Sequence, residues 1–337
     1  MTAEILATHT PELFQKAVRR AAVLLRAGEV VALPTETVYG VAANALDEKA
    51  VAKIFQIKGR PANNPIIVHV AGNEMAKSCA KNFPPIAEKL AESFWAGPLT
   101  LVLPRSEKIP DIVTAGGETV GIRWPSHPFI QAVIRECNFP LAAPSANLSN
   151  QISPTNAEHV RVQLAGKVPL IVDGGQSQVG IESTVLDLTV SPPRILRPGM
   201  IHAESLVAVC GKIQNPESGI QNSESALRSP GLLKKHYSPR AKLLVLDWKD
   251  EADLRFKIQN SKFKTTGCFV IAHTSIPAGE HFADVSVMPH DAEAFARALY
   301  AELHRCDAAG AELIVVEMPP QSAEWSGIAD RLRRAAA

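Results

Sequence analysis

The chain has 337 residues, more than one ordinary hydrophobic core accommodates, so two domains are expected. Its 46% hydrophobic and 20% charged residues are typical of a globular protein, and its net charge of +1 argues against a protein that mainly coats nucleic acid. Five widely spaced cysteines form no C-x-x-C pair, which argues against a structural zinc site or a disulfide framework. Without a signal-peptide pattern or an apolar run of bilayer length, a cytoplasmic protein with no membrane partner is expected.

Helix and strand patterns alternate over the first two hundred residues. A helix is predicted from Thr10 and Pro11 to just before Gly28, followed by a strand over 30–33. Further strands are predicted over 66–70, 100–103, 120–124, 141–143, 170–172 and 183–188, and further helices near 47–57, 85–94, 127–136 and 155–165. Some of these strands follow one another without a helix between them. The patterns therefore predict an α/β fold with an open, twisted, mixed sheet.

A segment without apolar periodicity follows. Residues 211–240 are rich in Asn, Ser, Gly and Pro, and they are predicted to be a linker. Beyond it, strands over 243–246, 268–271 and 313–316 alternate with helices over 250–259 and 292–304. This pattern predicts a smaller Rossmann-like α/β domain with parallel strands. The predicted organisation is a large domain over 1–210, a linker over 211–240 and a small domain over 241–337.

The loop after the second predicted helix combines cations, amides and prolines. Lys58, Arg60 and Asn64 lie in a segment whose backbone is restricted by Pro61 and Pro65. An Arg guanidinium binds two phosphate oxygens at once, while a Lys ammonium acts as a point charge. The loop therefore predicts a binding site for a polyanion. A solvated turn without a function is the alternative interpretation.

Polar residues also gather where predicted strands end, which is where open α/β sheets bind ligands. These residues are Thr35, Thr37, His69, Arg123, Ser145, Asn147, Ser153, Ser183 and Arg197. Because a buried Arg nearly always has an anionic partner, Arg123 is the strongest candidate for ligand binding. Structural explanations stay open for the others: the threonines fit a turn, His69 fits a core, and Ser153 before a proline fits a helix N-cap.

Several common catalytic motifs do not occur. The sequence contains no G-x-x-x-x-G-K-[ST] loop, no G-x-G-x-x-G fingerprint, no G-x-S-x-G elbow and no H-E-x-x-H helix. A site with cations, hydroxyls and amides but no signalled nucleophile favours catalysis by positioning and charge stabilisation.

These motifs resemble a known family. Lys58-x-Arg60, Ser145-x-Asn147 and the segment from Pro34 to Gly40 are similar to the signature of the YrdC-like threonylcarbamoyl-AMP synthases. The chain length, the linker and its end at 236–239 resemble the two-domain form of that family, and the resemblance is strongest over 30–200. One departure is Asn150, where the family usually has Gly. Because Asn tolerates a positive φ well, the loop geometry is expected to be kept.

The resemblance implies an L-threonylcarbamoyladenylate synthase, a nucleotidyltransferase. Such an enzyme joins L-threonine, bicarbonate and ATP, with Mg²⁺ accompanying ATP, into threonylcarbamoyl-AMP and releases pyrophosphate. The product supplies the N6-threonylcarbamoyladenosine modification of tRNAs that read codons starting with A, through downstream tRNA threonylcarbamoyl transferase proteins and with tRNA itself as a transient partner.

The resemblance also implies two sets of site residues. The L-threonine set is Thr35, His69, Arg123, Ala143 through its backbone, and Ser183. The nucleotide set is Lys58, Arg60, Asn64, Thr119, Ser145, Asn147, Ser153, Arg197 and His236. Lys58 and Arg60 would be the catalytic cations, and the resemblance implies no metal ligands among the side chains.

Alternatives from other classes remain. An RNA-binding module without adenylation activity is one, although the near-neutral charge argues against it. A carbamoyl transferase of hydrogenase maturation is another, but its zinc-finger and acylphosphatase-like segments have no counterpart here. The linker is either a passive tether or a lid over the nucleotide, and its excess of basic residues together with His236 favours the lid. The small domain could instead serve as a docking surface.

Overall fold

The computed structural model describes residues 3–164, 166–214, 229–230, 235–261 and 263–337. The chain divides into two compact units, Met1–Ser149 with Ser153–Leu233, and Asn150–Ile152 with Lys234–Ala337. None of the described helices is long and apolar enough to cross a membrane. Much of the predicted linker, 215–228 and 231–234, lies outside the described residues, so the division at 211–240 stays a prediction.

The first unit is built on one mixed sheet. Its described strands are β1 (Glu4–Ala7), β2 (Val31–Leu33), β3 (Gly40–Asn44), β4 (Val68–His69), β5 (Leu99–Pro104), β6 (Thr119–Arg123), β7 (Leu141–Ala142), β8 (Leu170–Asp173), β9 (Thr184–Asp187) and β10 (Arg194–Arg197). They are ordered β1-β8-β2-β3-β7-β4-β6-β5-β9-β10. At the centre, β4 runs parallel to β6, while β7 is antiparallel to β4 and β5 is antiparallel to β6.

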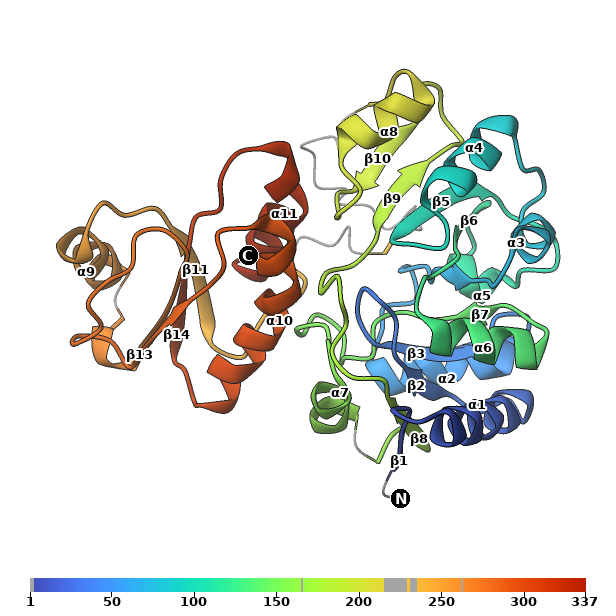
Figure 1. Ribbon diagram of the computed structural model, residues 1–337, viewed down its shortest axis with the longest axis horizontal. Helices are drawn as coiled ribbons and strands as arrows, with labels where there is room; N and C mark the ends of the chain where they lie inside the picture. Colours follow the sequence, from blue (N-terminus) through green and yellow to red (C-terminus); the bar gives the residue numbers. More distant parts are fainter. Residues whose placement is uncertain (1–2, 165, 215–228, 231–234, 262) are drawn as a thin grey trace. The chain divides into compact units, whose positions relative to one another are not determined.

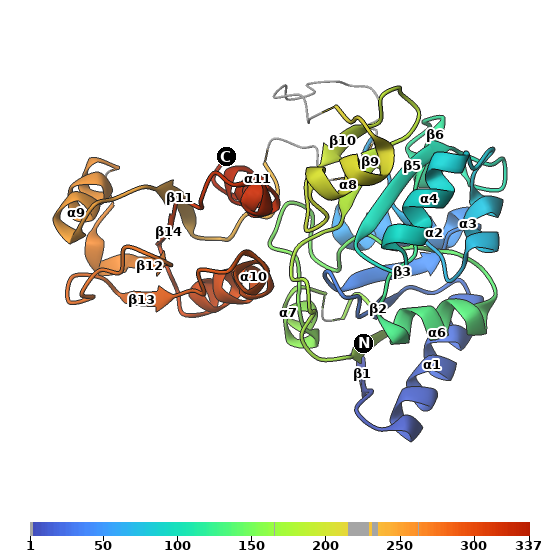
Figure 2. The same ribbon diagram turned by 45° about the horizontal axis from the view of Figure 1, so that its top comes forward.

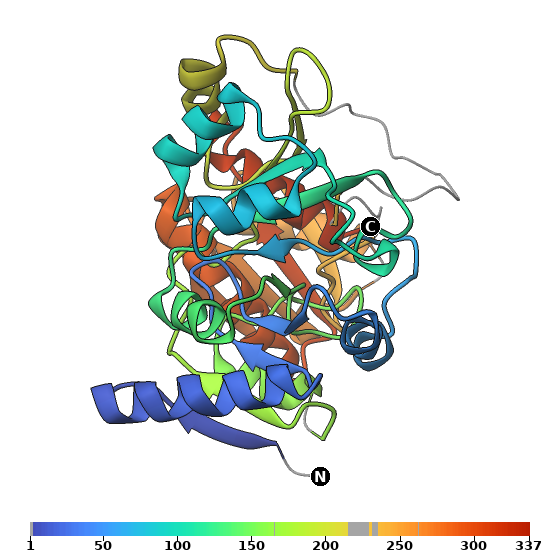
Figure 3. The same cartoon turned by 90° about the vertical axis from the view of Figure 1, so that its right-hand side faces the viewer.

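Helices cover both faces of this sheet. They are α1 (Pro11–Arg26), α2 (Glu48–Lys58), α3 (Asn73–Cys79), α4 (Pro85–Phe94), α5 (Asp111–Thr114), α6 (Pro128–Cys137), α7 (Ala157–Leu164) and α8 (Ala203–Cys210). Figures 1 and 3 show α1 (blue) beside α6 (green). Apolar residues of these two helices form one core with β2, β7 and β8. Val30 and Ala32, which alternate with the β2 residues of that core, belong to a second core that includes α2 and α4.

The ends of α2 place the predicted polyanion loop. The Asp47 side chain caps the helix by accepting hydrogen bonds from the backbone N–H groups of Lys49 and Ala50. The helix ends at Lys58 because Gly59 adopts a left-handed conformation with a φ of 60°. Lys58 therefore lies on the last helical turn, and Arg60 begins the following loop.

The second unit contains a smaller sheet of parallel strands. The strands β11 (Lys242–Leu246), β12 (Cys268–Ala272), β13 (Asp284–Val287) and β14 (Leu313–Glu317) are ordered β11-β14-β12-β13. The helices are α9 (Glu251–Asn260), α10 (Ala292–Ala308) and α11 (Ser326–Ala335), with short 3₁₀ turns at Thr265–Gly267 and Ala323–Trp325. Figure 2 shows α9 on one face of this sheet and α10 and α11 on the other. Parallel strands with helices on both faces are the arrangement that the sequence predicts, so the fold class is confirmed.

The differences from the sequence predictions concern short elements. The strands β1, β3, β10 and β13 and the helices α3, α5, α8 and α11 were not predicted. β3 consists mainly of Gly, Ala and Asn, which have little strand propensity, and β10 begins and ends with Arg. Their position in the sheet comes from pairing with β2 and β9, which are stronger strands.

Candidate active site

The predicted site residues do not all lie at one carboxyl edge of the sheet. His69 and Arg123 end the parallel strands β4 and β6. Because β7 runs antiparallel to β4, the amino end of β7 lies beside His69, and Ala143 follows its opposite end, where its N–H donates to the carbonyl of Ile67 at 3.2 Å. The carboxyl ends of β4 and β7 therefore lie at opposite edges of the sheet. Since β4 and β7 have two residues each, the two edges are only a short distance apart.

Arg123 is buried and bonded to the loop after β2. Its Nη1 donates to Thr37 Oγ1 at 2.9 Å, and its Nε lies 3.3 Å from the carbonyl oxygen of Gly97. Its Nη2 lies 2.7 Å from Glu36 Oε1, an ion contact between two nearly fully buried side chains. The sequence predicts an anionic partner for Arg123, and the structure supplies one from within the chain.

Glu36 is a buried carboxylate paired with Arg123. The backbone N–H of Ser126 also lies near its carboxylate. Burial alone would raise the pKa of Glu36, but the Arg123 guanidinium and nearby backbone N–H groups outweigh it and leave the pKa below its ordinary value. Glu36 is therefore an ionised, buried carboxylate at neutral pH.

His69 lies directly opposite Arg123 on the neighbouring strand. Its side chain is 3% exposed, and its Nδ1 has no hydrogen-bond partner among the described residues. Burial, followed by the positive charge of Arg123, lowers the pKa of His69 to about 3. The imidazole is therefore neutral at physiological pH and can accept a hydrogen bond.

This pKa makes stability depend on pH. An unfolded His has a pKa near 6.5, so the unfolded chain binds a proton at this residue below pH 6.5. In the folded protein, His69 binds this proton only near pH 3. Stability is complete above pH 6.5 and falls with acidification, by about 2 kcal/mol between pH 7 and pH 5. Chemical denaturation at both pH values should show this loss, and His69→Gln should reduce it. If the unfolding free energy of His69→Gln fell as much between pH 7 and pH 5 as that of the wild type, the low pKa of His69 would not be the cause.

Ser183 and Arg197 form a second buried group. Ser183 Oγ lies 2.8 Å from Thr100 Oγ1, and Arg197 donates from Nη2 to Ser183 Oγ at 3.1 Å and from Nε to the Ser183 carbonyl at 3.0 Å. The Nη1 of Arg197 lies 3.4 Å from the carbonyl oxygen of Pro230. Arg197 thus contacts both Ser183, which is predicted to bind threonine, and Pro230, which lies in the predicted lid segment.

Lys58 is buried rather than exposed. Its side chain is 3% exposed, and its Nζ donates to the carbonyl oxygens of Ser145, at 2.6 Å, and Asn147. Burial, and then the charge of Arg60, lowers the pKa of Lys58 well below its ordinary value. The structure therefore brings the two predicted motifs together, with Lys58 holding the Ser145–Asn147 loop in place.

The other predicted nucleotide residues form internal contacts. Arg60 donates from Nε to the carbonyl of Asn64 at 3.0 Å and from Nη2 to Asn64 Oδ1 at 2.7 Å. Ser153 Oγ donates to Glu182 Oε1 at 2.5 Å, and both residues are buried. Asn150 adopts a φ of 68°, so the expected replacement of Gly by Asn at a positive φ is confirmed.

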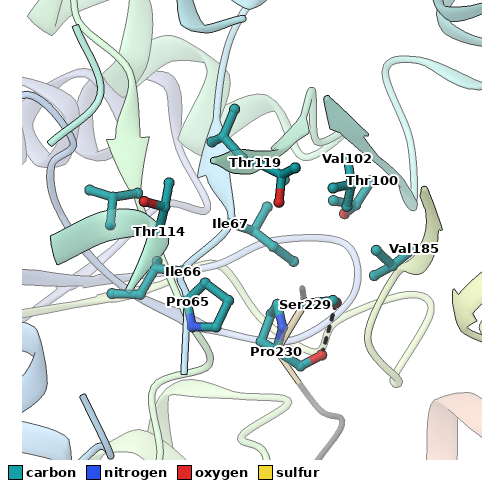
Figure 4. Close-up of a pocket in the computed structure, with 13 residues that line it drawn as sticks. Pro65, Ile66, Ile67, Thr100, Val102, Thr114, Thr119, Val185, Ser229 and Pro230 are labelled. Carbon is teal, nitrogen blue, oxygen red and sulfur yellow. Dashed lines mark hydrogen bonds between the residues drawn. The ribbon is translucent and has the colours of Figure 1, made fainter. Parts of the chain in front are cut away.

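A small pocket lies next to the Arg60 loop and the Ser183–Arg197 group (Figure 4). Thr119 lines it, as does Pro65, whose carbonyl accepts a hydrogen bond from Arg60 Nη2 at 2.6 Å. Ser229 and Pro230 line the same pocket. Its remaining walls are Ile66, Ile67, Thr100, Val102, Val113, Thr114, Val120, Gly121 and Val185. Part of the predicted lid segment therefore lies against the sheet.

His236 belongs to the second unit. Its N–H donates to the carbonyl of Arg334 at 3.2 Å, and its ring packs against Tyr237. Its predicted contact with the nucleotide stays a prediction.

Two buried carboxylates, Glu36 and Glu182, were not selected from the sequence. Glu36 lies between Thr35 and Thr37, and Glu182 directly precedes Ser183 and Thr184. The signal that was missed is an acidic residue inside an otherwise uncharged, hydroxyl-rich motif.

Comparison with known proteins agrees with this arrangement. A family model described as "Telomere recombination" matches residues 23–199, and one described as "Threonylcarbamoyl-AMP synthase, C-terminal domain" matches residues 201–337. The threonylcarbamoyl-AMP synthase of Pyrococcus abyssi is 42% identical over 94% of this chain and 93% of its own length. That of Bacillus subtilis is 41% identical over 98% and 94%. A crystal structure of Pyrococcus abyssi Sua5 complexed with L-threonine superposes with a TM-score of 0.90 and 38% identity, covering all of this chain and 98% of the other. Matched along nearly its whole length, the chain belongs to the two-domain branch of the Sua5, YciO and YrdC family.

Proposed function

We propose that this protein is a threonylcarbamoyl-AMP synthase, an enzyme that transfers the adenylyl group of ATP to N-carboxythreonine. The observation that carries the proposal is the full-length identity of 41–42% to proteins named for this activity. The buried contacts of Lys58 and Arg123 support it, because they join motifs that are far apart in the sequence. The tRNA modification that consumes the product is proposed on the same basis.

The reaction has two steps. The amine of L-threonine and bicarbonate form a carbamate and water, and a carbamate oxygen then attacks the α-phosphate of ATP while pyrophosphate leaves. Arg123 supplies a cation for the threonine carboxylate. Arg60, on a loop fixed by its own bonds to Asn64, supplies positive charge for the phosphates. Neither step needs an enzyme nucleophile.

Mg²⁺ is proposed as part of the ATP complex rather than as a resident metal. The described residues contain no group of three or more His, Cys, Asp and Glu side chains that could hold an ion. The phosphate oxygens of ATP would be its principal ligands.

We also propose that the segment within 211–240 covers the nucleotide. The described residues Ser229 and Pro230 support this, since they line the pocket with Thr119 and approach Arg197.

Pyrophosphate release tests the proposal. With Mg²⁺ and ATP, release should require both L-threonine and bicarbonate, and omission of either should reduce it to background. Release without threonine and bicarbonate, or no release under any condition, would contradict a synthase. In that case, RNA binding measured by mobility shift across a salt series becomes the next test.

A further inference from the structure

The acceptors around the buried Lys58 side chain suit its charged form. Its Nζ donates to the carbonyl oxygens of Ser145 and Asn147 and lies 3.5 Å from Asn147 Oδ1. Three acceptors match the three N–H donors of an ammonium, whereas a neutral amine has only two. The contacts therefore describe a protonated lysine, although Lys58 is only 3% exposed and the charge of Arg60 repels it.

An ammonium buried beside another cation needs a negative charge nearby, and Glu182 supplies one. Burial and the charge of Arg60 lower the pKa of Lys58, while the negative charge of Glu182 raises it. Glu182 is itself 7% exposed and lies in the loop before β9, far from Lys58 in the sequence. Opposite charges attract more strongly in a protein interior than in water, so the two buried groups stabilise each other.

Ser153 holds the Glu182 carboxylate. Its Oγ donates to Glu182 Oε1 at 2.5 Å, and Ser153 is fully buried. A hydrogen bond donated to a carboxylate favours the ionised form of that carboxylate. The hydroxyl of Ser153 therefore fixes both the position and the charge of the group that attracts Lys58.

We propose that Glu182 is a positioning residue of the nucleotide site, which balances the charge of the buried Lys58 ammonium and thereby prepares the site for ATP. This inference rests on the proposed function and deepens it. In the protein without substrate, Glu182 keeps the ammonium in place and Lys58 keeps the loop of Ser145 and Asn147 in place. When ATP binds, its phosphates bring further negative charge, so Glu182 matters more for binding ATP than for the later transfer step.

The pH dependence of pyrophosphate release tests this role. The profile of kcat/KM for ATP reports groups of the free enzyme, and the profile of kcat reports groups of the complex with substrate. Glu182→Gln removes the charge that raises the pKa of Lys58, so Lys58 should lose its proton at a lower pH. The alkaline limb of kcat/KM should therefore move to lower pH, and the limb of kcat should move less. At neutral pH, kcat/KM should fall by about 10-fold or more.

Two variants separate the charge of Glu182 from its other contributions. Ser153→Ala removes the hydrogen bond but leaves the carboxylate ionised at alkaline pH, so activity should fall while the alkaline limb stays at the wild-type pH. Asp187→Asn is the matched control, because Asp187 is a buried carboxylate at the end of β9 that accepts from the Thr189 hydroxyl at 2.6 Å. It should change neither kcat/KM nor the limb. Ionisation of threonine and bicarbonate is the same for all variants.

An alkaline limb that stays at the wild-type pH in folded Glu182→Gln would overturn the assignment. If that variant does not fold, the proton on Lys58 is measured directly in wild-type protein by an NMR titration of isotope-labelled lysine, with Lys58→Met to assign the signal. A charged Lys58 at neutral pH supports the assignment, and an uncharged amine overturns it.

Failure of the assignment and failure of the proposed function are distinguishable. Calorimetry measures ATP affinity across the same pH series without threonine and bicarbonate. If the wild type releases no threonine-dependent pyrophosphate, but Glu182→Gln loses ATP affinity at a lower pH than the wild type, the role of Glu182 stands and the synthase is removed. Threonine-dependent release by the wild type, combined with an unmoved limb in Glu182→Gln, removes only the role of Glu182.

Discussion

Replacing Lys58 by Ala is expected to reduce pyrophosphate release by at least about 100-fold and to destabilise the first unit by about 3 kcal/mol. The Nζ of Lys58 donates to the carbonyls of Ser145 and Asn147, and truncation leaves these carbonyl groups without their donor. The loop that contains Ser145 and Asn147 then loses its fixed position. Initial rates of pyrophosphate release and urea denaturation measure the two effects.

Lys58→Met separates the charge from the packing. Methionine fills most of the space of the lysine stem and avoids the cost of burying an ammonium, so the stability loss should shrink to about 1 kcal/mol. Activity should stay as low as in Lys58→Ala. The control is Lys49→Ala, an exposed lysine of the same helix, which should change neither quantity. Near-normal turnover in Lys58→Met would show that the ammonium has no part in the reaction.

Arg123→Gln is expected to weaken L-threonine binding by about 100-fold and to cost about 3–5 kcal/mol of stability. The affinity falls because the substrate carboxylate loses its cation. The stability falls because Glu36, 6% exposed, is left buried with an uncompensated charge. Calorimetry with threonine and chemical denaturation provide the measurements.

The double variant Glu36→Gln/Arg123→Gln tests the pair itself. Removing both charges eliminates the unpaired carboxylate, so the double variant should be more stable than Arg123→Gln alone. It should not regain threonine affinity. If Arg123→Gln bound threonine normally, another group would have to hold the carboxylate.

The long elements and the fold class follow from the sequence, and the short strands do not. The stripe of α1 and the Asp47 and Gly59 ends of α2 are local signals, so they predict helices directly. The strand β3 consists mainly of small residues, and it is a strand because β2 and β7 pair with it. Local propensity does not contain this information.

In the candidate active site, too, local sequence signals can be predicted but contacts between distant residues cannot. The types of Lys58, Arg60 and Arg123 indicate anion binding, and this much can be predicted. The atoms that each side chain contacts depend on residues distant in the sequence: Lys58 reaches Asn147, and Ser153 reaches Glu182. Glu36 resembles an ordinary turn residue in the sequence. Its importance appears only once burial and the contact with Arg123 are known.

The path of the chain near Asn150 limits how the protein can be divided. Residues 150–152 belong to the second unit, where the Asn150 carbonyl accepts the N–H of Ser238, although Ser149 and Ser153 belong to the first. A fragment that ends before residue 234 would leave this tripeptide, next to Ser153, without its hydrogen-bond partner. The two units are therefore not interchangeable modules, and gene fusions or domain swaps between relatives would have to replace the tripeptide and the second unit together.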